Sequence, residues 1–131
     1  MRDGEAQRYQ GLPVGVLQAI AMGYIREARE AWYSNGFEPM REDLLESADY
    51  IAAMLREKGV ETMLSETERM KLRGTPVGQL RRLRGEAREQ KDKDWMRAFP
   101  FLQLSLQEEI DFISGILDPL DAVPEVVEYV R

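Results

Sequence analysis

Four acidic residues in the first half of the chain have the types and the spacing to hold a divalent cation. Glu27 and Glu30 are three residues apart, and so are Glu46 and Asp49. Residues three apart on a helix lie on one face, so each pair would present its carboxylates together. Four like charges in a partly buried site repel one another unless a cation neutralises them. Oxygen-only ligation favours Mg²⁺ or Mn²⁺ over zinc.

The composition removes most other catalytic chemistry. The 131 residues include no cysteine and no histidine, which excludes disulfides, thiol nucleophiles, Ser-His-Asp triads and the Glu-x-x-His motif of di-iron bundles. The same acidic pairs also fit a second interpretation, a solvated face, because Glu46 and Asp49 lie away from the main apolar stripe of their segment. The residues alone leave both interpretations open.

Helices are the elements that would position these carboxylates, since strand-like alternation is absent. Apolar periodicity and capping residues predict four main helices, over about 13–35, 40–58, 75–95 and 105–117. A short helical link is expected at 65–71. Thr75 and Ser105 are the expected N-caps of the last two helices, and Asp118-Pro119 is the expected stop of the fourth.

The two halves of the chain resemble each other. Gly11–Leu17 (GLPVGVL) matches Gly74–Leu80 (GTPVGQL) at five of seven positions. A second set of matches, 62 residues apart, pairs Leu44, Glu46, Asp49, Ile51 and Leu55 with Leu106, Glu108, Asp111, Ile113 and Leu117. We therefore expect an all-α four-helix bundle made of two tandem, diverged αα-hairpins.

The predicted boundary between the hairpins falls after residue 73. Residues 1–73 would form the N-terminal hairpin with the acidic motif, and 74–131 a C-terminal diverged repeat in the same bundle. The repeat carries Glu86 and Glu89 one helical turn out of register and among several arginines. It is therefore expected to be degenerate and to complete the bundle without a second metal site.

The acidic motif resembles the signature of the all-α NTP pyrophosphatase superfamily, which includes MazG-like enzymes and the dimeric dUTPases. In this chain Glu-x-x-Glu is followed by Glu-x-x-Asp, sixteen residues from the second Glu to the third. Glu42–Glu61 (EDLLESADYIAAMLREKGVE) is similar to the second metal-binding helix of that family and its exit. Met70–Arg73 (MKLR) is similar to the basic run that follows the helix in many members.

The resemblance implies an Mg²⁺-dependent nucleoside triphosphate pyrophosphohydrolase, which converts an NTP or dNTP to the monophosphate and pyrophosphate. The metal ligands and catalytic residues that it implies are Glu27, Glu30, Glu46 and Asp49. The bound Mg²⁺ (or Mn²⁺) would activate water and neutralise phosphate charge. Lys71 and Arg73 would bind phosphate oxygens of the nucleotide. The resemblance also suggests a homodimer or a higher oligomer.

The charge distribution supports an alternative from another class. The net charge is −6, yet residues 69–93 hold nine Lys or Arg against three Asp or Glu. This segment suits a phosphate-bearing ligand or a solvated basic face, while the acidic total argues against nucleic acid as the partner. The alternative is a non-catalytic helical interaction or regulatory module, such as a phage-encoded one, with a partner on the basic third helix. No signal peptide or long apolar span is evident, so we expect a cytoplasmic protein without membrane contact.

Overall fold

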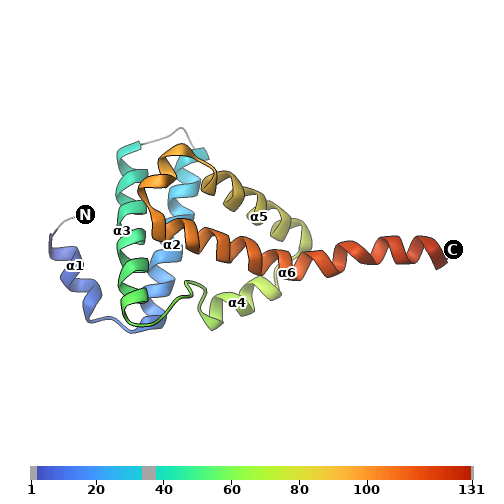
Figure 1. Cartoon of the computed structure of the whole chain (residues 1–131), viewed down its shortest axis with the longest axis horizontal. Coiled ribbons are helices and arrows are strands. Elements are labelled where there is room, and N and C mark those ends of the chain that lie inside the picture. Colours follow the sequence, from blue (N-terminus) through green and yellow to red (C-terminus); the bar gives the residue numbers. More distant parts are fainter. Residues whose placement is uncertain (1–2, 34–37, 131) are drawn as a thin grey trace.

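The computed structural model describes residues 3–33 and 38–130, with side chains described for 6–30 and 39–120. Throughout the described ranges the regular structure is helical, which confirms the expected all-α class. In chain order the elements are α1 (Asp3–Gln10), α2 (Val14–Tyr33), α3 (Glu38–Glu57), α4 (Glu66–Arg73), α5 (Val77–Lys91), the 3₁₀-helix η1 (Asp94–Ala98) and α6 (Pro100–Val130) (Figure 1).

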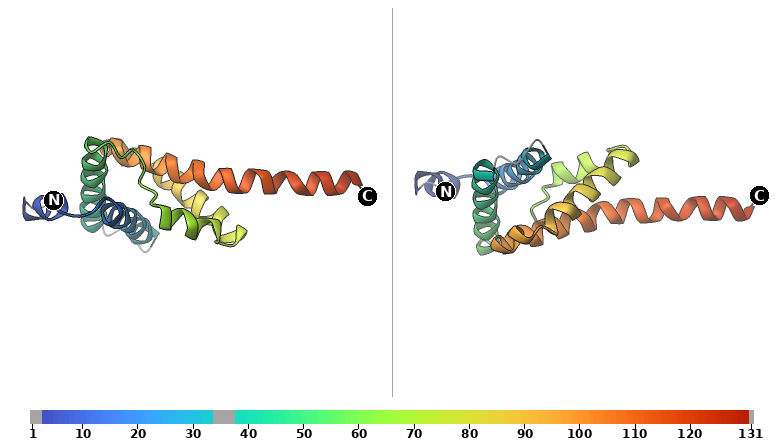
Figure 2. Two further views of the ribbon diagram at one scale, coloured as in Figure 1. Left: turned by 90° about the horizontal axis from the view of Figure 1, so that it is seen from below. Right: turned by 90° about the horizontal axis from the view of Figure 1, so that it is seen from above.

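Two helical hairpins form the body of the molecule. Helices α2 and α3 pack against each other as antiparallel neighbours, and α5 packs against α6 after the chain turns through η1 (Figure 1). Helix α6 also packs against α3 and so joins the hairpins. Figure 2 shows that α6 runs across α3 and not along it. The second hairpin is therefore rotated relative to the first.

One hydrophobic core runs through both hairpins. Its largest fully buried side chains are Leu17, Ile25, Leu45, Ile51, Leu55, Leu64, Leu80, Met96, Leu102, Leu106, Ile113 and Leu117. Complete burial of a Leu or Ile side chain contributes about 1.5–3 kcal/mol. Residues 1–73 and 74–131 share this core. Two matched pairs of the sequence repeat, Ile51 with Ile113 and Leu55 with Leu117, are buried in both copies.

Helix α4 occupies the link between the hairpins, where the sequence predicts a short helix. Helix α3 ends before Gly59, which takes a φ of 83° that residues with a side chain rarely adopt. Helix α4 begins after Ser65, whose hydroxyl oxygen accepts the N–H of Glu68 at 3.2 Å. This contact satisfies one of the N–H groups that a helix start leaves without a partner.

The boundaries predicted for the fourth helix are wrong at both ends. Helix α6 begins at Pro100, and Ser105 lies inside it with its hydroxyl donating to the Phe101 carbonyl at 3.1 Å. Pro100 is favourable at this position, because the fixed φ of proline suits the first helical residue. The helix also continues past Asp118-Pro119. Pro119 is exposed, so water can reach the carbonyl that lacks a donor there.

The third predicted helix also differs from the structure, and α1 was not expected. Thr75 does not cap α5, because its hydroxyl donates to the Lys71 carbonyl of α4 at 2.7 Å. Helix α5 ends at Lys91, and Trp95 lies in η1. Helix α1 is too short for a periodic signal. Its Tyr9 is only 4% exposed and shares a 3.0 Å hydrogen bond with the Tyr24 hydroxyl.

Candidate functional site

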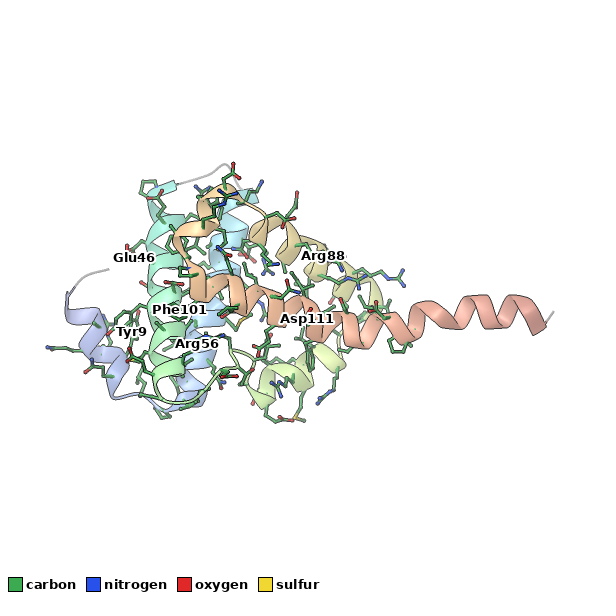
Figure 3. All side chains as sticks on the ribbon, viewed as in Figure 1. Tyr9, Glu46, Arg56, Arg88, Phe101 and Asp111 are labelled. Atoms are coloured by element: carbon green, nitrogen blue, oxygen red, sulfur yellow. The ribbon has the colours of Figure 1, made fainter. Side chains whose placement is uncertain are left out.

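Three of the four predicted metal ligands lie on exposed helix surfaces. On α2, Glu27 and Glu30 are exposed while Ala28 and Arg29 between them are buried. On α3, Glu46 is exposed, and Figure 3 shows it on the side of α3 that is turned away from α2. The two helices are neighbours as predicted, but these carboxylates do not lie on the faces that meet.

The fourth predicted ligand, Asp49, caps α6 from the neighbouring hairpin. Its Oδ1 accepts hydrogen bonds from the backbone N–H groups of Phe101 at 3.0 Å and Leu102 at 3.1 Å. The first N–H groups of a helix lack partners within the helix, and the helix dipole favours an anion there. Burial raises the pKa of the Asp49 carboxyl, although the two hydrogen bonds act in the opposite direction. Asp49 thus has a structural role at the joint between the hairpins.

A metal centre is not preassembled in the part of the chain whose side chains are described, which includes all four carboxylates. No three acidic side chains there are grouped in a way that could hold a metal ion. Mg²⁺ ligation by Glu27, Glu30, Glu46 and Asp49 therefore stays a prediction from the sequence motif.

The two predicted phosphate-binding residues, Lys71 and Arg73, occupy the last turn of α4. Lys71 is exposed and lines a cleft between α2 and α4. The guanidinium of Arg73 lies 5.4 Å from the ring centroid of Phe112 on α6 and 4.0 Å from the Glu66 carboxylate. The structure places these two cations in different surroundings and does not gather them at one point.

The most buried charges of the described chain form a group that sequence reasoning missed. Arg29, 3% exposed, donates from Nη2 to Glu109 Oε1 at 2.8 Å, and Glu109 is fully buried. Gln90 accepts the Nε–H of Arg29 at 3.1 Å and donates to the Ile25 carbonyl at 3.2 Å. These contacts tie α2 to α5 and α6 at the centre of the fold.

Arg26 extends this group toward the surface. Its Nη2 lies 3.3 Å from Glu109 Oε2 and also pairs with Glu68 of α4. Burial acts to lower the pKa of Arg26, but its hydrogen bonds and charge contacts with Glu68 and Glu109 outweigh burial and raise it. We call Arg26, Arg29, Glu68, Gln90 and Glu109 the buried charge cluster.

The buried charge cluster is balanced in charge but not in hydrogen bonds. Its two arginines and two glutamates cancel. However, Arg26 Nε and Arg29 Nη1 are buried without a hydrogen-bond partner. Removing one member of such a pair is strongly destabilising, because it leaves the other charge buried and uncompensated. The cluster therefore contains more buried N–H donors than acceptors for them.

A sequence signal for this cluster exists in hindsight. Arg29 continues the spacing of the buried residues Met22 and Ile25, and Glu109 falls between Leu106 and Ile113. Each charge therefore stands where the apolar stripe of its helix predicts an apolar residue. Two such positions with opposite charges indicate a buried ion pair.

Glu108, the neighbour of Glu109, holds the loop before α4. Its Oε1 accepts the backbone N–H groups of Met63 at 2.8 Å and Leu64 at 3.2 Å. Glu108 is the repeat partner of Glu46 in the sequence comparison. Like Asp49, it uses its charge to satisfy backbone N–H groups of a segment that is distant in the chain, here the loop before α4.

A cleft of about 540 Å³ opens between α2 and α4 beside the buried charge cluster. Arg26 and Glu68 line it together with Lys71. Its apolar lining includes Met22 and Met63. The cleft is the place where a predicted site residue, Lys71, and the newly found cluster come together.

The basic surface of α5 consists of Arg81, Arg82 and Arg88, all exposed; Figure 3 shows Arg88 on α5. The side chain of Arg82 is 71% exposed, and its only close carboxylate contact in the described chain is with Glu86 at 3.9 Å. Arg84 is different, because it donates to the Ser114 hydroxyl and lies 3.5 Å from the Asp118 carboxylate. An exposed pair like Arg82–Glu86 contributes about 0–1 kcal/mol, so this surface can exchange it for other anions.

The fold and these sites define an all-helical domain of two crossed hairpins, joined by a buried charge cluster and by carboxylate caps. No family model matches the chain, and no curated protein or solved structure matches it significantly. None of the helices, over the residues that the structure describes, is both long enough and apolar enough to cross a membrane. The resemblance to the pyrophosphatases therefore rests on the motif residues alone.

Proposed function

We propose that this chain is a non-catalytic helical interaction module that binds an acidic partner through the basic surface of α5. The observation that carries the proposal is the placement of the four motif carboxylates. Asp49 is engaged by backbone N–H groups of α6, and Glu27, Glu30 and Glu46 are exposed. A solvated acidic face and a structural cap account for these residues without a cation.

The acidic character of the partner follows from charge complementarity. The exposed arginines of α5 stand out from a chain of net charge −6. A patch of one sign on a molecule of the other sign steers oppositely charged partners and repels wrong ones. Arginine also forms two parallel hydrogen bonds with a carboxylate, which adds orientation to the charge contact.

A synthetic glutamate-rich peptide is the probe for this surface. We expect it to bind the protein at low salt and to bind the Arg82→Gln/Arg88→Gln variant about ten-fold more weakly. The matched control is Arg8→Gln/Lys58→Gln, which removes two exposed positive charges from α1 and from the turn after α3. Equal loss in both variants, or no binding of the peptide to the unmodified protein, contradicts a specific surface on α5.

The second candidate is the Mg²⁺-dependent nucleoside triphosphate pyrophosphohydrolase. The order and spacing of Glu27, Glu30, Glu46 and Asp49 favour it, since the two pairs stand on neighbouring antiparallel helices. Release of pyrophosphate from a panel of NTPs and dNTPs with Mg²⁺ separates the two proposals. Turnover that disappears in Glu46→Gln overturns the non-catalytic module. Absence of turnover on every nucleotide rules out the pyrophosphohydrolase.

A further inference from the structure

The cleft between α2 and α4 has the size and lining of a ligand site that the α5 surface does not use. Its volume of about 540 Å³ falls within the range of small-molecule pockets, roughly 300–1,000 Å³. Met22 and Met63, each 3% exposed, form part of its apolar floor. Ser65, Thr67 and Lys71 place two hydroxyls and an ammonium along the α4 side. The lining is therefore amphipathic.

The charge of the cleft is positive because Lys71 is uncompensated. Arg26 and Glu68 also line the cleft, but both belong to the buried charge cluster, whose charges cancel. Lys71 takes part in none of the ion pairs between residues that the structure describes, and it is exposed. An anionic group in the cleft would thus meet one unpaired cation.

We propose that the α2–α4 cleft binds a small amphipathic monoanion. Its anionic head lies beside Lys71 and the Thr67 hydroxyl, which are one helical turn apart on α4. Its apolar body lies against Met22 and Met63. The ligand is a free small molecule, because the cleft is concave and its volume matches a molecule of that size.

Decanoate, a ten-carbon carboxylate, is the probe, used below the concentration at which it forms micelles. The comparison ligands share its chain: decanol is neutral and decyltrimethylammonium is cationic. We expect saturable shifts of the Gly15 and Gly23 amide signals in ¹H–¹⁵N spectra, because both residues line the cleft. Decanoate is expected to bind more tightly than decanol, and decanol more tightly than the ammonium.

Two variants of equal size test the charge argument in opposite directions. Lys71→Gln is expected to weaken decanoate binding about two- to five-fold, as loss of an exposed charge contact does. Glu68→Gln is expected to strengthen it by a similar factor, because it removes the carboxylate that lines the cleft. Lys58→Gln, which removes an exposed cation outside the cleft, is the matched control and should leave the affinity unchanged.

Two further variants keep the test independent of the buried charge cluster, since Glu68→Gln also disturbs Arg26. Thr67→Glu adds a negative charge at the lining and is expected to weaken decanoate without weakening decanol. Ala19→Leu reduces the space in the cleft and is expected to weaken both. The proposal is overturned if decanoate binds no more tightly than decanol, or if neither Lys71→Gln nor Thr67→Glu changes the affinity for decanoate. So do shifts that leave Gly15 and Gly23 unaffected.

Discussion

The two faces of the middle of α2 use their charges in opposite ways. Within Arg26-Glu27-Ala28-Arg29-Glu30, the two glutamates are exposed and the two arginines turn inward to Glu109 and Glu68. The outer carboxylates meet water, where an exposed charge contributes little. The inner arginines contact a fully buried carboxylate, where loss of either partner strongly lowers the free energy of unfolding. Arg26 and Arg29, and not Glu27 and Glu30, therefore stabilise this part of the fold.

The largest expected effect comes from breaking the buried ion pair between Arg29 and Glu109. Arg29→Met leaves Glu109 without its closest charge partner, so we expect the free energy of unfolding to fall by about 3–5 kcal/mol. The double variant Arg29→Met/Glu109→Met should recover most of this loss, because no uncompensated charge remains buried. Urea denaturation measures both. A loss below about 1 kcal/mol in the single variant would show that the pair is not important for stability.

An intermediate effect is expected at Asp49, which lies between the two extremes in burial. Asp49→Ala removes the acceptor for Phe101 and Leu102, so it should lower the free energy of unfolding by about 1–2 kcal/mol. Asp49→Asn keeps an oxygen acceptor and should lose much less. If both variants lose the same amount, the negative charge matters more than the two hydrogen bonds.

The pH dependence of the same position has a defined sign. Burial raises the pKa of folded Asp49 above its usual value of 3.8. A raised pKa gives a stability contribution that is complete below the unfolded pKa and is lost as the pH rises through the folded pKa. The stability of the wild type relative to Asp49→Asn should therefore decline as the pH rises through and above the usual titration range of aspartate. A difference that grows with pH would contradict the burial argument.

The smallest effect is expected on the outer face. Glu27→Gln and Glu30→Gln should each change the free energy of unfolding by less than about 0.5 kcal/mol, because both side chains are exposed. Thermal denaturation with and without Mg²⁺ extends the comparison. A melting temperature that rises with Mg²⁺ in the wild type but not in Glu27→Gln would show that Mg²⁺ binds to this face of α2.

The outer and inner faces of α2 also show which features could be predicted from the sequence and which could not. Apolar spacing predicts α2 and α3 because each helix buries its own stripe, and that local pattern needs no knowledge of other elements. The sequence predicts that α6 starts at Ser105 and not at Pro100, because the capping residue, Asp49, lies 52 residues away from Phe101 in the chain. The spacing of acidic residues pointed to Glu27 and Glu30 and not to Arg26 and Arg29, because spacing fixes which residues share a face but not which face is buried.

By itself, the sequence determined the helical class, the two hairpins and the short helix between them, since the apolar periodicity of a helix acts within a few residues. Only the tertiary structure decided how the hairpins cross, and with that crossing it decided the roles of the charges. Helix α6 brings Glu109 to Arg29 and its own first N–H groups to Asp49. Whether a charge is buried, paired or exposed depends on residues that are distant in the chain, and burial sets the energy of a charge.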